Sequence, residues 1–216
     1  MIRADFHIHT EHSPDSVMPV RSLVRRCQSQ GLGLIAVTDH NSLEGGLRAR
    51  EIADFPVIVG EEVTTADGEL TGLFLTEPIP RGLPATETAK RIKNQGGLVS
   101  IPHPFDVFRR HVITPDALAE VVAMADIIEG FNARNTFKSA NARAKELAAS
   151  AGLPMTAVSD SHTAMELGRT YTELTIDEVT PDALLAAIAS GRLVERPITP
   201  LIHFLTTMAK VRKRLF

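Results

Sequence analysis

Short runs of apolar, β-branched residues alternate along this chain with longer stretches that carry apolar residues at helical spacing. The short runs predict β-strands at residues 34–37, 57–59, 70–75, 98–101, 126–128 and 154–158. The longer stretches predict helices at residues 20–30, 85–95 and 140–151, and each is followed by a glycine, which favours the left-handed backbone of a helix end. The alternation predicts an α/β fold built around parallel strands.

The sequence Thr-Pro-Asp-Ala-Leu occurs at residues 114–118 and again at 180–184. Each copy predicts a helix start, with Thr as N-cap, Pro at the first helical position and Asp facing the helix dipole. No Gly/Ser/Pro-rich linker interrupts the chain, so we expect one domain over residues 1–216, with 177–216 a helical extension packed on it. The basic residues at 210–214 are typical of a solvated helix end, with a phosphate-backbone contact as the alternative.

Composition narrows the class of protein. A chain of 216 residues with 44% hydrophobic content can bury one sizeable core, and no apolar run approaches the roughly 18 residues that cross a bilayer. The formal charge of −3 excludes a global field that attracts nucleic acid. Cys27 is the single cysteine, and the first residues contain no apolar signal core, so we expect a soluble cytoplasmic protein with no obligate protein partner.

Histidines and carboxylates follow the predicted strands, at the point where each strand ends. The segments are Asp5 to His9, Thr38-Asp39-His40, Gly60-Glu61-Glu62, Pro102-His103-Pro104 and Asp160-Ser161-His162. Because the carboxyl ends of parallel strands meet on one face of an α/β barrel, these side chains are expected to gather there. The set offers nitrogen and oxygen ligands but no sulfur, which suits Zn, Mn or Fe in an open catalytic site.

Other common catalytic motifs do not occur in the chain. There is no G-x-S-x-G, no G-x-x-x-x-G-K-[ST], no H-E-x-x-H and no G-x-G-x-x-G. Cys27 lies in a predicted helix beside two arginines, and we interpret it as a packing residue. The histidine and carboxylate segments therefore carry the functional interpretation.

These segments, in this order, resemble the PHP family, the polymerase and histidinol phosphatase domains. The resemblance runs over residues 3–176. The segment Ile128-Glu129-Gly130-Phe131-Asn132-Ala133-Arg134 resembles the small stand-alone members with a PHP-associated C-terminal region. It implies a distorted seven-stranded (β/α) barrel that holds two to three divalent metal ions and hydrolyses phosphate esters.

The resemblance also implies roles for particular residues. His7, His9, Glu62 and Asp160 match one metal and the water that it activates, Glu62 bridges to a second metal with His103, and Asp15, His40 and His162 match a third. Glu62 is preferred to Glu61 because the family's spacing is G-x-E, and His12 is expected to be a bystander.

One position departs from the family pattern. Many relatives have a histidine where this chain has Glu69, which either ligates the second metal or is a solvated turn residue. Among the neighbouring charged residues, Arg109 and Arg134 are the candidates for binding substrate phosphate, and each has a surface arginine as its alternative. Asp5 and Asp39 are expected to orient ligating imidazoles.

The implied activity is hydrolysis of a small nucleotide or of an oligonucleotide end. The alternatives are a histidinol-phosphatase-like phosphomonoesterase and a non-catalytic binding module that metal stabilises. All three depend on divalent ions.

The nine candidate ligands are more than one tetrahedral or octahedral ion uses. We therefore predict that the metal-replete protein carries about two to three divalent ions per chain. Elemental analysis of the purified protein measures this number. One ion or fewer per chain would contradict a site for several metals.

Overall fold

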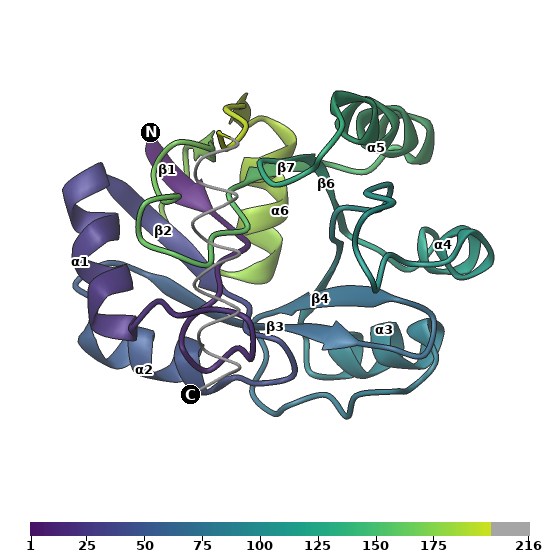
Figure 1. The fold of residues 1–216 in the computed structure, drawn as a ribbon, viewed down its shortest axis with the longest axis horizontal. Helices are drawn as coiled ribbons and strands as arrows, with labels where there is room; N and C mark the ends of the chain where they lie inside the picture. Colours follow the sequence, from purple (N-terminus) through teal and green to yellow (C-terminus); the bar gives the residue numbers. More distant parts are fainter. Residues whose placement is uncertain (200–216) are drawn as a thin grey trace.

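The computed structural model describes residues 1–199, in which the strands form one nine-stranded sheet with the order β7-β6-β5-β4-β3-β2-β1-β8-β9 (Figure 1). The strands are β1 Ile2–Asp5, β2 Leu32–Val37, β3 Val57–Thr64, β4 Glu69–Leu73, β5 Leu98–Ile101, β6 Ile127–Asn132, β7 Met155–Val158, β8 Tyr171–Leu174 and β9 Arg192–Val194. The helices are α1 Val20–Gln30, α2 Glu44–Ile52, α3 Ala85–Asn94, α4 Pro115–Val121, α5 Lys138–Ala151 and α6 Pro181–Ala189.

The sheet curls into a nearly closed barrel. Its two halves meet just beyond β1 and β7, where Ile8 and Ser161 form a parallel bridge and the His9 N–H donates to the Ser161 carbonyl over 2.9 Å. β8 pairs with β1 and also contacts β7, where the Thr172 hydroxyl donates to the Ala157 carbonyl over 3.2 Å. The α/β class is therefore confirmed.

The number and direction of the strands differ from the expectation. The sheet has nine strands rather than seven, because β8 and β9 add an antiparallel pair beyond β1. β4 is also antiparallel to β3 and β5. A turn from Thr65 to Gly68 separates β3 from β4, and so short a connection makes a hairpin, since a parallel pair needs a crossover of a dozen or more residues.

Local signals predicted several elements well. α1 matches the expected range, and it ends at Gly31 in the left-handed conformation. Thr114 and Thr180 accept N-cap hydrogen bonds from Ala117 N and Ala183 N, as the repeated pentapeptide predicts. The first strand ends at Asp5 rather than running on to His9. The extension expected to be helical over residues 177–216 contains the helix α6 and also the strand β9, which pairs with β8. Its last part, with the basic residues at 210–214, lies outside the described residues.

The three largest buried clusters of the described residues hold the helices and the barrel together. α1 packs against Ile35 and Val37 on the outer face of β2, and α3, α4 and α5 pack against strands β3 to β6. A third cluster joins Leu184 of α6 to Ala4, Leu34 and Ile127. Because strands from both halves of the sheet contribute to it, this cluster fills the inside of the barrel and leaves the carboxyl ends of the parallel strands for polar side chains.

No helix among residues 1–199 combines the length and the apolar composition that a membrane span requires.

Leu184 tests whether α6 folds as part of the same unit as the barrel. Its side chain is fully buried in the inner cluster, so Leu184→Ala is expected to lower the free energy of unfolding of the whole protein by about 2–5 kcal/mol. Leu185→Ala, at a partly buried position on the same helix, is the control and should cost less. Denaturant unfolding that shows two separate transitions would contradict a single domain.

Candidate metal centre

All nine predicted ligands lie together at the carboxyl end of the barrel. They fall into four overlapping groups whose ligand atoms lie within 4.8 Å of one another: His9, Asp15, His40 and His162; His7, Glu62 and His103; His7, His9 and Asp160; and His40, Glu62 and Glu69. His12 belongs to none of these groups, and its role as a bystander stays a prediction.

Different parts of the strands bring these residues to one place. His7 and His9 follow β1, His103 follows β5 and Asp160 follows β7, whereas Glu69 is the first residue of β4. Because β4 runs antiparallel to its neighbours, its amino end lies beside the carboxyl ends of the parallel strands. The expected gathering of ligands is therefore present, although one of them reaches it through an antiparallel strand.

The backbone is strained at two of these positions. His103 and Asp160 have φ angles of 27° and 51°, in the left-handed region that costs a non-glycine residue of order 1–3 kcal/mol. Both residues are fully buried and lie two positions after a strand end. Glu129 accepts from the His103 N–H, and Asn132 donates to the Asp160 carboxylate, so hydrogen bonds hold both residues in this conformation.

The carboxylate of Glu62 lies at the centre of the site. Its Oε2 atom is 3.2 Å from His7 Nε2, 3.3 Å from His9 Nε2 and 3.2 Å from His40 Nδ1. Its Oε1 atom is 2.9 Å from His103 Nε2. Burial opposes ionisation of this carboxyl, but the imidazoles outweigh burial and hold its pKa well below the ordinary value. Glu62 is thus placed to bridge two cations.

Asp160 divides its two oxygens between the protein and the site. Oδ2 accepts hydrogen bonds from Arg109 Nη2 and from Asn132 Nδ2, the latter over 3.0 Å. Oδ1 is 3.5 Å from His9 Nε2 and 3.5 Å from His162 Nδ1. Burial opposes ionisation, yet Arg109 and His7 keep the pKa of Asp160 well below its ordinary value. Oδ1 is therefore an anionic oxygen that faces the imidazoles.

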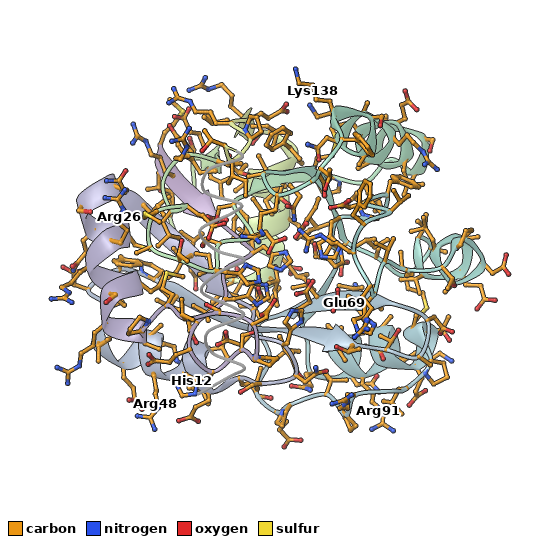
Figure 2. The ribbon with its side chains drawn as sticks, in the orientation of Figure 1. His12, Arg26, Arg48, Glu69, Arg91 and Lys138 are labelled. Atoms are coloured by element: carbon orange, nitrogen blue, oxygen red, sulfur yellow. The ribbon has the colours of Figure 1, made fainter. Side chains whose placement is uncertain are left out.

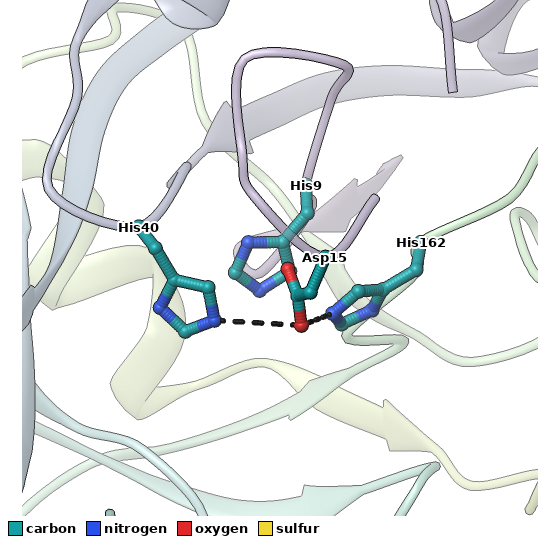
Figure 3. Close-up of side chains that lie close together, drawn as sticks. All are labelled: His9, Asp15, His40 and His162. Carbon is teal, nitrogen blue, oxygen red and sulfur yellow. Dashed lines mark hydrogen bonds and ion pairs between the residues drawn. The ribbon is translucent and has the colours of Figure 1, made fainter. Parts of the chain in front are cut away.

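Asp15, in the loop between β1 and α1, belongs to the group with His9, His40 and His162 (Figure 3). Its Oδ2 atom lies 2.9 Å from His162 Nε2 and 3.7 Å from His40 Nε2. Ser13 Oγ donates to the other carboxylate oxygen over 3.0 Å. Burial opposes ionisation of Asp15, but the imidazole of His162 outweighs burial and lowers its pKa. The spacing from His9 thus delivers a charged oxygen to this group.

Glu69 is buried within the site and is not a solvated turn residue, with a relative exposure of 6% (Figure 2). Its Oε1 atom is 3.5 Å from His40 Nδ1, and its Oε2 atom is 4.0 Å from His103 Nε2. Burial and the nearby charge of Glu62 raise the pKa of Glu69 to about 8. A cation beside both carboxylates would remove this repulsion.

Glu61 and Glu62 are adjacent but have different surroundings. Glu61 Oε2 accepts from the Ile79 N–H over 2.9 Å and belongs to none of the four ligand groups. Burial raises the pKa of Glu61 to about 7. The choice of Glu62 over Glu61 as the candidate ligand therefore agrees with the geometry.

Glu129 is a buried carboxylate at the site to which the sequence analysis assigned no role. It lies in β6, and its Oε1 atom is 2.5 Å from His7 Nδ1. Its Oε2 atom accepts from the His103 N–H and from Asn132 Nδ2, each over 2.9 Å. An acidic residue inside the apolar run 127–131 was the available signal, because such a residue needs a buried partner.

Asp5 and Asp39, expected to orient imidazoles, form their hydrogen bonds elsewhere. Asp5 Oδ1 accepts from the Ser159 N–H over 3.0 Å, and Asp39 accepts from Thr10 N over 2.5 Å and from Thr10 Oγ1 over 2.6 Å. Burial raises the pKa of Asp5 to about 7 and that of Asp39 to about 6. Both carboxyls tie neighbouring strand ends together, whereas Glu129 contacts the His7 imidazole.

The two candidate arginines have protein partners. Arg109 donates to Asp160 and also, over 3.4 Å, to Asn132 Oδ1. Arg134 is buried and forms an ion pair with Glu166, which also accepts from the His162 N–H over 2.8 Å. Arg109 thus contacts a candidate ligand directly, and Arg134 is linked through Glu166 to the backbone of another.

The donor set fits divalent cations. Glu62 Oε2, Asp160 Oδ1 and His40 Nδ1 are buried and have no hydrogen-bond partner within residues 1–199. Buried polar atoms normally have partners, so these atoms are available as ligands. Imidazole and carboxylate donors without thiolate suit Zn, Mn or Fe.

Glu129 generates the prediction for this site. A metal-binding imidazole donates its other N–H to a fixed acceptor, and loss of such an acceptor typically weakens metal affinity about 10- to 100-fold. Glu129→Gln, which keeps the shape of the side chain and removes its charge, is expected to weaken divalent metal affinity within this range. Calorimetric titration of the apo protein measures it. Glu87→Gln, which removes an exposed carboxylate of α3, is the control, and equal affinities in both variants would exclude this role.

Comparison with known proteins identifies relatives of the chain. The PHP domain family matches residues 5–100, and the PHP-associated family matches residues 138–193. Two uncharacterised proteins of Methanocaldococcus jannaschii are similar in sequence. One is 39% identical over 117 residues, which cover 48% of this chain and 68% of the relative. The other is 34% identical over 189 residues, which cover 85% of this chain and 75% of the relative.

Solved structures with 16–19% sequence identity share the fold. A Bacteroides vulgatus two-domain protein that contains a predicted PHP-like metal-dependent phosphoesterase has a TM-score of 0.72 and 19% identity, over 90% of this chain and 65% of that one. PsfC from Pseudomonas syringae has a TM-score of 0.72 and 16% identity, over 98% and 99% of the two chains. An amidohydrolase from Chromobacterium violaceum, with bound sulfate, has a TM-score of 0.60 and 16% identity, over 90% and 94%. From these motifs, family matches and fold, the chain belongs to the PHP family, with a PHP-associated region in its C-terminal part.

Proposed function

We propose that this protein is a metal-dependent phosphoesterase that hydrolyses a small phosphorylated substrate. The observation that carries the proposal is the Glu62 carboxylate, which lies within 3.3 Å of nitrogen atoms of four imidazoles. A site that shares one carboxylate among several imidazoles suits two or three cations held close together, the arrangement that phosphate transfer uses.

The proposed ligands fall into three sets. His7, His9, Glu62 and Asp160 would hold the first cation, Glu62, Glu69 and His103 the second, and Asp15, His40 and His162 the third. When bound, such ions lower the pKa of water and neutralise charge that develops on phosphate oxygens.

The protein's own residues would prepare the site for this task. Glu129 would hold the His7 ring with its Nδ1 proton toward the carboxylate, which leaves Nε2 free to ligate. Asn132 and Arg109 keep Asp160 ionised and fixed through Oδ2. Cys27 is buried and its thiol pKa is raised by burial, so it is not an activated nucleophile. The chemistry accordingly calls for water rather than a protein nucleophile.

Arg109 and Arg134 remain the candidates for phosphate recognition. The Arg109 side chain is 20% exposed beside Asp160, so part of its guanidinium can meet a substrate oxygen. We propose a nucleotide or an oligonucleotide end as substrate, with histidinol phosphate and non-catalytic metal binding as alternatives.

Substitution of two imidazoles tests the proposal. His40→Ala and His103→Ala are each expected to lower phosphoesterase activity by orders of magnitude, because each removes a proposed ligand. His12→Ala is the control, since its imidazole belongs to none of the four ligand groups. Manganese-supplemented assays on phosphomonoesters, phosphodiesters and nucleotides measure the rates, and melting curves separate loss of folding from loss of chemistry. No turnover of any substrate by the wild type would favour the non-catalytic alternative.

A further inference from the structure

A cavity of about 580 Å³ lies between the loop 104–113, α4 and α5. Its volume is within the range of about 300–1,000 Å³ that small-molecule sites occupy. Most of its lining is apolar, with contributions from Phe105, Leu118, Val122 and Leu147. The cavity is therefore large enough for an aromatic ring and offers it an apolar surface.

The cavity adjoins the candidate metal centre. Arg109 lines it and also donates to Asp160, while Pro104 and Phe105 directly follow His103. A larger cavity, of about 700 Å³, lies along α5. None of the nine candidate ligands lines either cavity, but Arg109, which contacts Asp160, lines the smaller one and not the larger one. The smaller cavity is thus connected to the metal centre through Arg109.

The charged residues that line the cavity are all basic. Arg109, Arg110 and Arg143 line it, and no acidic residue of the described chain does. The guanidinium carbon of Arg143 lies 4.1 Å from the centroid of the Phe105 ring, so this cation already covers an aromatic face. The surroundings complement a molecule that combines a planar apolar ring with negative charge.

The loop beside the cavity also exposes apolar side chains. Val107, which lines the cavity, is 72% exposed, and the neighbouring Phe108 is 67% exposed. Exposed apolar side chains grouped at a cavity are typical of binding sites rather than of ordinary surface.

We propose that this cavity binds the organic part of the substrate, and that this part contains a planar apolar ring such as a nucleobase or a phenyl group. The inference rests on the proposed phosphoesterase function. The phosphate would lie at the metal centre beside Arg109, and the ring would extend along the Arg109 side chain between α4 and α5. The cavity would then select aromatic phosphate esters over esters of small aliphatic alcohols.

Ala119 allows the cavity to be filled without disturbing the core. It is an exposed residue of α4 that lines the cavity, so Ala119→Trp introduces bulk there without overpacking the interior. Ala149→Trp places the same side chain at an exposed position of α5 that does not line the cavity. Ala119→Phe is the second variant, in case the tryptophan lowers the melting temperature.

The test compares the KM for benzyl phosphate with the KM for ethyl phosphate. Both esters release a primary alcohol, and only benzyl phosphate carries a ring. For the wild type we expect a KM at least about tenfold lower for benzyl phosphate, the effect of burying a ring. Ala119→Trp should remove this preference and leave the KM for ethyl phosphate unchanged. Ala149→Trp should keep the wild-type KM for both esters. Benzylphosphonate is not hydrolysed, so calorimetry on the metal-loaded variants measures binding apart from turnover. Its affinity should fall in Ala119→Trp and stay at the wild-type value in Ala149→Trp.

The outcomes separate the cavity from the chemistry. Hydrolysis of both esters with equal KM, unaffected by Ala119→Trp, would overturn the inference and leave the phosphoesterase function standing. No hydrolysis of either ester or of the phosphodiesters and nucleotides assayed above, together with benzylphosphonate binding that Ala119→Trp abolishes, would support the cavity and refute the function. No hydrolysis of any of these substrates and no phosphonate binding would overturn both.

Discussion

The fully buried carboxylate of Glu62 is the constraint on which the site depends. A carboxylate without water is costly unless cations or strong donors surround it, and here His7, His9, His40 and His103 surround it from three separate strand ends. Five buried or half-buried imidazoles and four carboxylates in one space also need compensation from one another or from cations. Burial of this polar cluster costs free energy of folding. Burial of the apolar side chains of α6 and of the strands inside the barrel offsets this cost.

A second network keeps the cluster in place. Glu129 connects β6 to the His7 ring and to the backbone of His103, and Asn132 connects the same strand to Asp160. These contacts join segments that follow β1, β5 and β7, so one strand sets the geometry at three strand ends. The left-handed backbone at His103 and Asp160 is stable because these hydrogen bonds hold both residues in it.

Arg109 connects a candidate ligand to a cavity. Its guanidinium keeps Asp160 ionised, while its side chain lines the cavity between α4 and α5. In the proposed function, the residue that contacts the substrate would therefore be the one that helps to set the charge of a proposed ligand. Loops on a rigid barrel commonly carry such specificity, because they vary without disturbing the strands that hold the catalytic groups.

Local sequence signals determined much of this protein. The helix ends and both threonine caps could be predicted from single segments, because caps depend on neighbouring residues. The strand-end segments pointed to the histidines and to Glu62 and Asp160, whereas Asp15 and Glu69 became candidates only through the resemblance to the PHP family. Because Glu61 and Glu62 interrupt the apolar run that begins at Val57, the sequence predicted a strand shorter than β3. The hairpin that makes β4 antiparallel to β3 was not predicted. The tertiary structure alone decided that Glu69 is buried, that β8 and β9 extend the sheet, and that Glu129 contacts His7 across 122 residues of chain. Such contacts depend on strand direction and on packing between distant segments, which no local pattern encodes.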